Sequence, residues 1–350
     1  MDRERDYSIE KDMSMLQRAE KAGRRFLNPV PTVVGGLELA FKVLPQFLFN
    51  RQEREPKQAL GPYRTNGAAY ETKPVSGLRI TWMGHSSMLV EIDGVLVLVD
   101  PVWDERASPV QWAGPKRFFA PTLRLEDLPP IDAVLVSHDH YDHLGAGTVR
   151  RLAVLQPQAR WVTPLGVGAI LRRLGVRAER ITEMDWTETV PIAGAAGARC
   201  EITAMPARHF SGRGAFNRFE TLWASFVLRG AGHTVYYGAD SGWWEGFAEI
   251  GAAVGPFDVT MLEIGAYNEL WQSIHLGPDA AVRAFRALGG EGLLMPIHWG
   301  LFSLALHAWR QPMERLLELA EVEDLKLWSP EPGLPSEVVR GAELRSDWWR

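Results

Sequence analysis

Short apolar runs separated by turn residues dominate the pattern of the chain from residue 78 onward. Such runs favour buried strands, and segments with apolar positions three and four apart favour helices. The pattern predicts strands at residues 78–83, 87–92, 95–99, 133–136, 160–163, 200–205, 222–228, 234–238, 259–263 and 292–296. It predicts helices at residues 148–155, 168–174, 278–288 and 313–320. The Asp93-Gly94 dipeptide between two of these strands is typical of a hairpin turn.

The predicted strands fall into two successive groups, each with helices after its strands. This order favours an α/β fold of four layers, an αββα sandwich in which two sheets pack back to back and helices cover the outer faces. We expect this domain to span residues 78–325. Prolines and glycines punctuate residues 1–77, which predicts an N-terminal extension packed on the core. Residues 326–350 form a polar, proline-rich C-terminal tail.

The stretch from Phe26 to Phe49 is apolar but is interrupted by prolines, glycines and the charged residues Glu38 and Lys42. It falls short of the roughly 18 uninterrupted apolar residues that indicate a membrane-spanning helix. We therefore expect an arm packed on the core. A lipid-facing segment is the alternative, which becomes relevant if the substrate is a lipid.

The composition is that of a globular protein, with 46% apolar and 23% charged residues among 350. The net charge of -5 gives no broad positive surface for a phosphate backbone, so we expect no nucleic-acid partner. Cys200 is the only cysteine, which excludes an intramolecular disulfide and favours a reducing compartment. The charged start of the chain is atypical of a secretory signal. A cytoplasmic protein is expected, and peripheral contact with the inner membrane surface and the oligomeric state stay open.

Four potential metal ligands lie within six positions directly after the strand predicted at residues 133–136: His138, His140, Asp142 and His143. Alternate residues of an extended segment point the same way, so the first two can hold one ion while the last two face a second. Two ions roughly 3.5–4 Å apart can share a hydroxide. Imidazole and carboxylate ligands without a thiolate favour two zinc ions, and manganese or iron is not excluded by these ligand types.

This run resembles the signature of the metallo-β-lactamase superfamily, and the superfamily's other motifs are matched in order over roughly residues 78–301. The matching residues outside the run are Asp100, His209, Asp240 and His298. The resemblance implies one metal ion held by His138, His140 and His209, a second held by Asp142, His143 and His298, and Asp240 bridging the two. We expect Asp100 to lie behind the ligands, where it fixes their loop by accepting backbone N–H bonds.

Two positions narrow the chemistry that the resemblance implies. Many zinc β-lactamases have a cysteine where this chain has Asp240, and the di-iron oxygen-reducing members have a glutamate where it has His140. The chain therefore looks like a hydrolase of phosphodiesters or esters. Segments 82–87, 100–103, 265–267 and 273–280 resemble the N-acyl-phosphatidylethanolamine phospholipase D branch and its bacterial relatives, and the sugar-lactone hydrolase branch shares parts of this pattern.

Within the phospholipase branch, the resemblance implies that His275 contacts the phosphate or head group of the substrate, and Tyr267 is taken as a second substrate contact. The alternative for His275 is a polar residue at the entry of the helix that follows Pro278. Tryptophans near these segments could line an acyl groove, although most tryptophans belong to the core.

The sequence thus supports the hypothesis of a metal-dependent phosphodiesterase that acts on a small-molecule or lipid phosphodiester. In this hypothesis a hydroxide between two zinc ions attacks phosphorus, Asp142 orients it and accepts its proton, and His275 holds the phosphate or protonates the leaving oxygen. One alternative is a lactonase or other carboxylic-ester hydrolase with the same dinuclear site. Another is a metal-binding protein without turnover, which the cost of keeping buried charged ligands disfavours.

Overall fold

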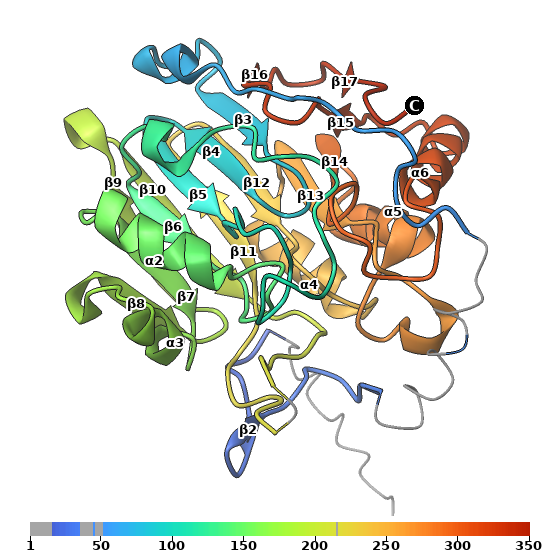
Figure 1. Cartoon of the computed structure of the whole chain (residues 1–350), viewed down its shortest axis with the longest axis horizontal. Helices are drawn as coiled ribbons and strands as arrows, with labels where there is room; N and C mark the ends of the chain where they lie inside the picture. The colour runs from blue at the N-terminus through green and yellow to red at the C-terminus, as the bar shows by residue number, and fades with distance from the viewer. Residues whose placement is uncertain (1–15, 36–44, 46–51, 215) are drawn as a thin grey trace, which may run out of the picture.

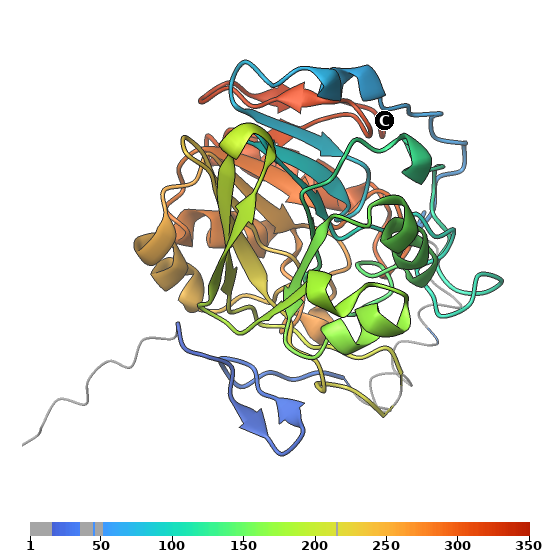
Figure 2. The same ribbon diagram turned by 90° about the vertical axis from the view of Figure 1, so that its left-hand side faces the viewer.

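The computed structural model describes residues 16–35, 45, 52–214 and 216–350. Two sheets pack face to face at the centre of the molecule, and helices lie on their outer sides (Figure 1). In the view turned by 90°, the two sheets appear as separate layers, with the green helices on one side and the orange ones on the other (Figure 2). This arrangement confirms the predicted αββα sandwich.

The first sheet has seven strands in the order β16-β3-β4-β5-β6-β7-β8. Strands β16 to β5 pair antiparallel, and β5 to β8 pair parallel. Its strands are β3 (Leu78–Trp82), β4 (Met88–Ile92), β5 (Val95–Val99), β6 (Ala133–Leu135), β7 (Arg160–Pro164), β8 (Ile181–Met184) and β16 (Ser336–Glu337).

The second sheet has six strands in the order β14-β13-β12-β11-β10-β9. Strands β12, β13 and β14 pair parallel, and the other pairs are antiparallel. Its strands are β9 (Thr189–Ala193), β10 (Arg199–Met205), β11 (Ser225–Arg229), β12 (Thr234–Tyr237), β13 (Val259–Glu263) and β14 (Leu293–Ile297).

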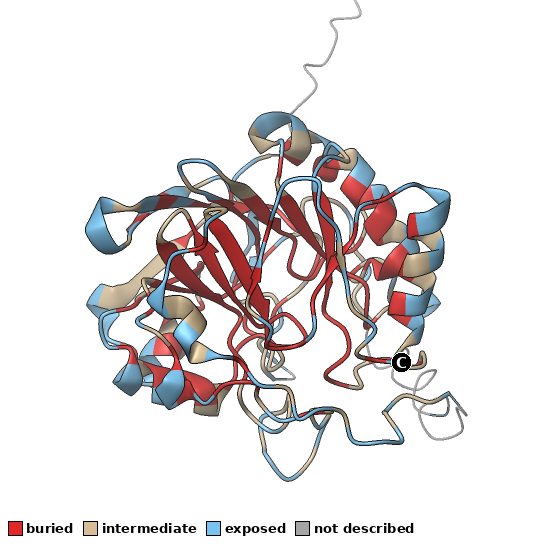
Figure 3. Ribbon diagram, turned by 90° about the horizontal axis from the view of Figure 1, so that it is seen from above, coloured by how far each residue is buried: buried red, intermediate tan, exposed pale blue. Residues whose placement is uncertain are grey.

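Strand β5 shows why these runs are continuously apolar. Val97 faces the core between the two sheets, whereas its neighbours Leu96 and Leu98 face a second core under the helices. Side chains of a strand alternate between its faces, so a strand buried on both faces has apolar residues throughout. Figure 3 shows the buried strands enclosed by helices with exposed outer faces. These helices are α2 (Ala146–Leu155) and α3 (Gly168–Arg173) beside the first sheet, and α4 (Gly246–Val254), α5 (Gly277–Ala287) and α6 (Gln311–Val322) beside the second.

The predicted strands and helices are present, and most bounds agree within about two residues. The strand predicted from residue 222 is the main correction, because β11 begins at Ser225. The sequence pattern did not predict β8, β9 or α4. Strand β9 contains Pro191 and lies at the edge of its sheet, where a residue without an N–H donor is tolerated but weakens the sequence signal.

Residues 1–15 of the predicted N-terminal extension lie outside the described residues. Its described part includes a hairpin of β1 (Lys21–Ala22) and β2 (Arg25–Phe26), drawn in blue in Figure 2. The Phe26 side chain is buried, and its backbone N–H donates to the carbonyl of Phe219. Residues 36–44 and 46–49 of the predicted arm lie outside the described residues, so its packing there and its contact with lipid stay predictions. In the described ranges, no helix combines the length and hydropathy that crossing a membrane requires.

The tail beyond residue 325 is less polar than its sequence pattern suggests. It adds β16 to the first sheet and forms a small parallel pair from β15 (Trp328–Ser329) and β17 (Leu344–Arg345). The side chains of Trp328 and Trp349 are buried in the main core. Isolated tryptophans at the end of a chain carry no periodic signal, which explains why the sequence did not predict this packing.

Candidate metal centre

The predicted ligands lie in loops that follow strands of both sheets. The 138–143 loop follows β6, whereas His209, Asp240 and His298 follow β10, β12 and β14. These strands run in the same direction within their sheets, so their carboxyl ends meet at one edge of the sandwich. Open α/β sheets bind ligands at this edge. The fold therefore brings all seven predicted ligands together, although they are far apart in the sequence.

The first group of donors consists of His138, His140, His209 and Asp240. The Nε2 atom of His138 and the Nδ1 atom of His140 are 2.9 Å apart, and His209 Nε2 lies 3.4 Å from the same Nδ1 atom. Asp240 Oδ2 is 3.8 Å from His138 Nε2 and 3.7 Å from His209 Nε2. Four ligands about 2.0–2.1 Å from a tetrahedral zinc ion are roughly 3.3 Å apart, so these separations suit one such ion.

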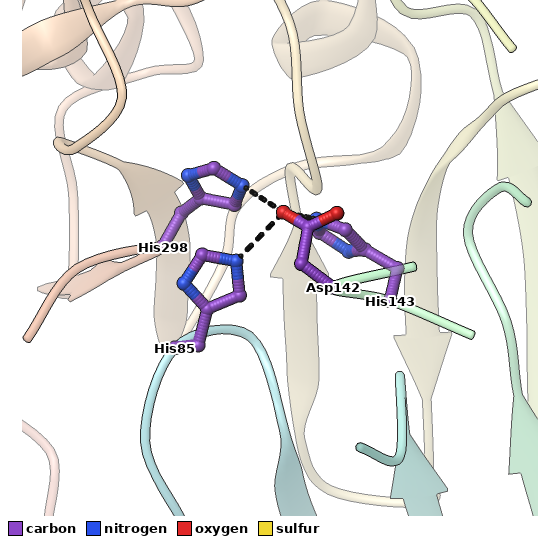
Figure 4. Close-up of side chains that lie close together, drawn as sticks. All are labelled: His85, Asp142, His143 and His298. Atoms are coloured by element: carbon purple, nitrogen blue, oxygen red, sulfur yellow. Dashed lines mark hydrogen bonds and ion pairs between the residues drawn. The ribbon is translucent and has the colours of Figure 1, made fainter. Parts of the chain in front are cut away.

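The second group consists of His85, Asp142, His143 and His298, which Figure 4 shows converging on one carboxylate oxygen. Asp142 Oδ2 lies 3.0 Å from His85 Nε2, 3.2 Å from His298 Nε2 and 3.6 Å from His143 Nε2. The three imidazoles come from three separate loops. Their nitrogens and this oxygen surround a second position of the size that one cation needs.

Asp240 contacts both groups. Its Oδ2 atom lies 3.1 Å from His298 Nε2, in addition to its separations from the first group, and its Oδ1 atom lies 3.2 Å from His143 Nε2. The side chain is 2% exposed, so water does not compensate its charge. A carboxylate in this place can bind two cations at once, as the sequence predicted for Asp240.

Asp100 lies directly behind the ligand loop and is fully buried. Its Oδ1 atom accepts the backbone N–H of Ser137 at 2.7 Å. Its Oδ2 atom accepts hydrogen bonds from the Ser137 hydroxyl, from the Tyr237 hydroxyl and, at 2.6 Å, from the Nδ1–H of His143. Because Nδ1 of His143 carries the proton, its Nε2 is free to face the second group.

Other supports orient the first group in the same way. The Nδ1–H of His209 donates to the carbonyl of Ile274 at 2.9 Å, which leaves Nε2 to face the other donors of the first group. Asp139 also lies in the 138–143 loop but is not one of the donors. Its carboxylate accepts the backbone N–H of Gly212 at 2.7 Å and the hydroxyl of Thr221 at 3.0 Å. These bonds tie the 138–143 loop to the loop that carries His209.

The electrostatics of the two groups differ. Burial lowers the pKa of His138 and of His209 well below the usual histidine value. Burial also acts to lower the pKa of His298, but Asp240 and Asp142 raise it to about 10. Burial acts to raise the pKa of Asp142, but neighbouring histidines hold it well below its usual range. The histidines of the first group are therefore neutral and able to bind a cation, whereas in the second group the proton on the His298 ring offsets the charge of the neighbouring carboxylates.

The burial and the chemical types of these side chains are suited to a pair of metal ions. His143 Nε2 and Asp240 Oδ1 are buried and lie 3.2 Å from each other, and neither makes a hydrogen bond with a described residue. Buried polar atoms without partners are costly, and cations at the two positions would satisfy them. All the donors are imidazole nitrogens or carboxylate oxygens, the types that zinc, manganese and iron accept.

A cleft of about 270 Å³ opens over the two groups. Arg218 contributes a guanidinium, which donates to the carbonyl of Gly35 at 2.7 Å, so the described end of the N-terminal arm forms part of the wall. The cleft is lined by Val34, Gly35, His140, Asp142, Phe210, Arg218, Asp240, Ala266, Trp271, Ile274, His275, His298 and Leu304. The apolar walls and the charged floor suit a ligand with both an apolar and an anionic part.

The two predicted substrate contacts occupy different places. His275 lines the cleft, and its Nδ1–H donates to Glu263 at 2.7 Å. Tyr267 stacks on His307, with ring centroids 4.8 Å apart, and lines a neighbouring groove of about 830 Å³ rather than the cleft itself. The structure therefore brings His275, but not Tyr267, to the candidate metal centre.

The backbone around the centre adopts conformations that side chains seldom allow. His85, Asp100 and His298 have φ values of +56°, +38° and +60°. Positive φ in residues other than glycine concentrates at functional sites because surrounding contacts must hold it. Gly265 approaches the carbonyl of His298 so closely that a Cβ atom there would lie 2.1 Å from it. A side chain at Gly265 would therefore displace His298, a predicted ligand.

The sequence motifs did not assign His85 and Glu263 to the centre. His85 lies in the turn between β3 and β4. This turn belongs to the segment 82–87 that resembles the phospholipase branch, and that resemblance was the one sequence feature that could have indicated His85. Glu263 ends a fully buried and otherwise uncharged strand, Val259–Glu263, in which a single charged residue is unexpected. A fully buried glutamate at a strand end indicates a partner in the site that the strand faces.

Comparison with known proteins gives a consistent result. The family model described as a β-lactamase superfamily domain matches residues 96–299. The chain is 46% identical over 277 residues to an uncharacterized protein of Mycobacterium tuberculosis, which covers 79% of this chain and 72% of that protein. It is 38% identical over 259 residues to the N-acyl-phosphatidylethanolamine-hydrolyzing phospholipase D 1 of Caenorhabditis elegans, and the aligned region covers 72% of each protein.

Among solved structures, the metallo hydrolase Igni18 of Ignicoccus hospitalis matches with a TM-score of 0.55 and 22% identity, over 74% of this chain and 97% of that one. At this identity the likeness concerns the fold.

Proposed function

Since the chain belongs to the β-lactamase superfamily of metal-dependent hydrolases, we propose that it is a two-zinc phosphodiesterase of the N-acyl-phosphatidylethanolamine phospholipase D type. The observation that carries this proposal is the pair of donor groups that share Asp240 beneath one cleft. Two cations in such an arrangement can clamp the attacking and the leaving oxygen of a phosphoryl transfer.

Each predicted ligand has a place in this proposal. Bound zinc ions would supply an activated water and neutralise charge on the phosphoryl oxygens. Asp142, whose Oδ2 atom faces the second group, would orient the attacking water and accept its proton. One ion would be held by His138, His140 and His209, and the other by Asp142, His143 and His298, with Asp240 between them.

The remaining residues of the cleft would bind the substrate. Arg218 offers a positive charge at the wall of the cleft, and His275 offers an imidazole edge close to the metal centre. We expect Arg218 to hold the phosphate. The Nε2 atom of His275 would take over the proton that Asp142 accepts from the water and would pass it to the leaving oxygen. Phe210, Trp271 and Leu304 would contact an apolar arm of the substrate, as a lipid phosphodiester possesses.

The test uses the full chain loaded with zinc. We expect two zinc ions per chain by elemental analysis, and hydrolysis of N-acyl-phosphatidylethanolamine vesicles and of bis-p-nitrophenyl phosphate. A chelator should abolish both activities, and added zinc should restore them. His275→Ala should lower kcat on both substrates, whereas His233→Ala, which alters a histidine paired with Asp93 at a distant hairpin, should not.

A panel of lactones, tested at the same zinc loading, distinguishes the proposed phosphodiesterase from the alternative, a lactonase or other carboxylic-ester hydrolase. A higher kcat/KM on lactones than on phosphodiesters would replace the proposal, and inertness on phosphodiesters with zinc, manganese and iron would end it.

A further inference from the structure

Glu263, the last residue of β13, is a fully buried carboxylate beside the candidate metal centre. Its Oε1 atom accepts the backbone N–H of Ser241 at 2.8 Å and that of Leu276 at 3.1 Å. Its Oε2 atom lies 2.7 Å from the Nδ1 atom of His275. One carboxylate thus joins the segment after Asp240 to the segment that carries His275.

This contact decides which nitrogen of His275 carries the proton. Two backbone N–H groups already donate to this carboxylate, which suits its ionised form. With Glu263 ionised the carboxylate only accepts, so the Nδ1 atom donates and a neutral ring is protonated there. The Nε2 atom is then the nitrogen of His275 that remains for the cleft, which this side chain lines. Glu263 therefore selects both the tautomer and the direction of the ring.

The same carboxylate lies behind His298. Its Oε2 atom is 3.8 Å from His298 Nδ1, a buried atom with no hydrogen-bond partner among the described residues. The other nitrogen of that ring, Nε2, is 3.1 Å from Asp240 Oδ2. Carboxylates commonly support metal-binding imidazoles from this side.

The hydrogen bonds of Glu263 favour a supporting role over direct coordination. Oε1 already accepts two backbone N–H groups, which use its two lone pairs. Oε2 is engaged by His275. Three hydrogen bonds therefore fix the carboxylate to the site loops, and only Oε2 keeps a lone pair beyond them.

We propose that Glu263 is a positioning residue that holds His275 as its Nδ1–H tautomer and directs Nε2 into the cleft. Its consequence for turnover rests on the proposed phosphodiesterase function. The tautomer of His275 can be measured without any substrate, so the failure of one idea is distinguishable from the failure of the other.

The first experiment measures the tautomer by long-range ¹H–¹⁵N NMR of His275 in the zinc-loaded chain, with the ring neutral. Wild type should show the Nδ1–H form. Glu263→Gln keeps an oxygen for the two backbone N–H groups but presents an amide N–H₂ to Nδ1, so the proton should move to Nε2. On phosphodiesters, kcat should fall about 10- to 100-fold for this variant, with KM changed much less.

A double-mutant cycle separates positioning from a general structural effect. If Glu263 acts through His275, the pair Glu263→Gln with His275→Ala should be no slower than His275→Ala alone. Glu183→Gln is the matched control, because Glu183 also accepts two backbone N–H groups, at 2.6 and 3.1 Å, but lies beside α3 away from the centre. This control should retain the wild-type kcat.

Three results would overturn the inference. They are an Nε2–H tautomer in the wild type, additive losses in the cycle, and the loss of one zinc ion per chain from Glu263→Gln at saturating zinc, which would make Glu263 a ligand. If the wild type hydrolyses no phosphodiester, the proposed function fails, but the NMR measurement still decides the role of Glu263.

Discussion

The Nε2 atom of His85 lies 3.0 Å from the Oδ2 atom of Asp142, closer than the ring nitrogens of the two predicted ligands of that group. The His85 ring is buried and stacks obliquely on His298, with centroids 4.0 Å apart. Its position gives the second group three imidazoles, as many as the first group has. The two positions are therefore more alike in their donors than the sequence motifs imply.

Replacing His85 should weaken the second metal position selectively. His85→Asn removes the ring but suits the positive φ at this position, since asparagine tolerates left-handed backbone better than most residues. We expect the affinity for one of two zinc ions to fall about 10- to 100-fold, while the other ion stays bound. Competition with a chromophoric chelator measures both affinities, and an equal loss of the two ions would contradict this assignment.

Asp100→Asn should destabilise the fold and loosen the ligand loop together. Oδ2 of Asp100 accepts three hydrogen bonds, including those of His143 and Tyr237, and an amide nitrogen in its place accepts none. We expect a loss of about 3 kcal/mol in the free energy of unfolding, measured with urea. The gap to wild type should widen when zinc is added, because a weaker site gains less from the ion.

Asp132→Asn is the control for that change, because Asp132 accepts a single backbone N–H, from Leu96, away from the centre. If this variant lost as much stability as Asp100→Asn, the network around the ligand loop would have no special part in stability.

The two metal positions should respond differently to pH. Neighbouring carboxylates raise the pKa of His298 to about 10 against the effect of burial, so its ring holds a proton at pH 7 in the protein alone. Zinc binds only the neutral ring and must displace this proton, so affinity falls as the pH falls, about tenfold per unit for each proton. Burial lowers the pKa of His138 and His209, which are already neutral, so the first position should change little from pH 6 to 8.

Isothermal titration of zinc at pH 7 in buffers of different ionisation enthalpy counts the protons released by each ion. Equal release at the two positions would show that the carboxylates do not set the protonation of His298.

The sequence was sufficient to identify the residues of the centre where several ordered motifs coincide. A histidine such as His209 or His298 carries no information alone, but its place after a strand in a fixed order does. The structure brings these residues within reach of one another, and their role as ligands remains a prediction. The alternation of residues such as Leu96 and Val97 between two cores likewise makes the strands of the sandwich visible in the sequence.

The residues that the sequence could not assign act through tertiary contacts. Glu263 contacts His275, which lies twelve residues further along the chain, and His85 contacts Asp142, which lies 57 residues further along. Neither pair has a spacing that one strand or helix imposes, so no local pattern indicates it. Strand β9 was missed for a similar reason, since its pairing with β10 rather than its composition makes it a strand.

The tryptophans at the end of the chain should contribute strongly to stability. Trp349 is 2% exposed and packs edge-on against Trp299, with ring centroids 5.2 Å apart. The Trp299 ring also stacks on Trp82, with centroids 5.5 Å apart. Trp349→Ala should leave a cavity in this cluster and lower the free energy of unfolding by about 3–5 kcal/mol. Trp299 directly follows the candidate ligand His298, so weaker zinc binding should accompany the loss. Urea denaturation and zinc titration of Trp349→Ala, compared with the exposed Trp112→Ala, measure both effects. A stability equal to that of the control would mean that the tail only rests on the core.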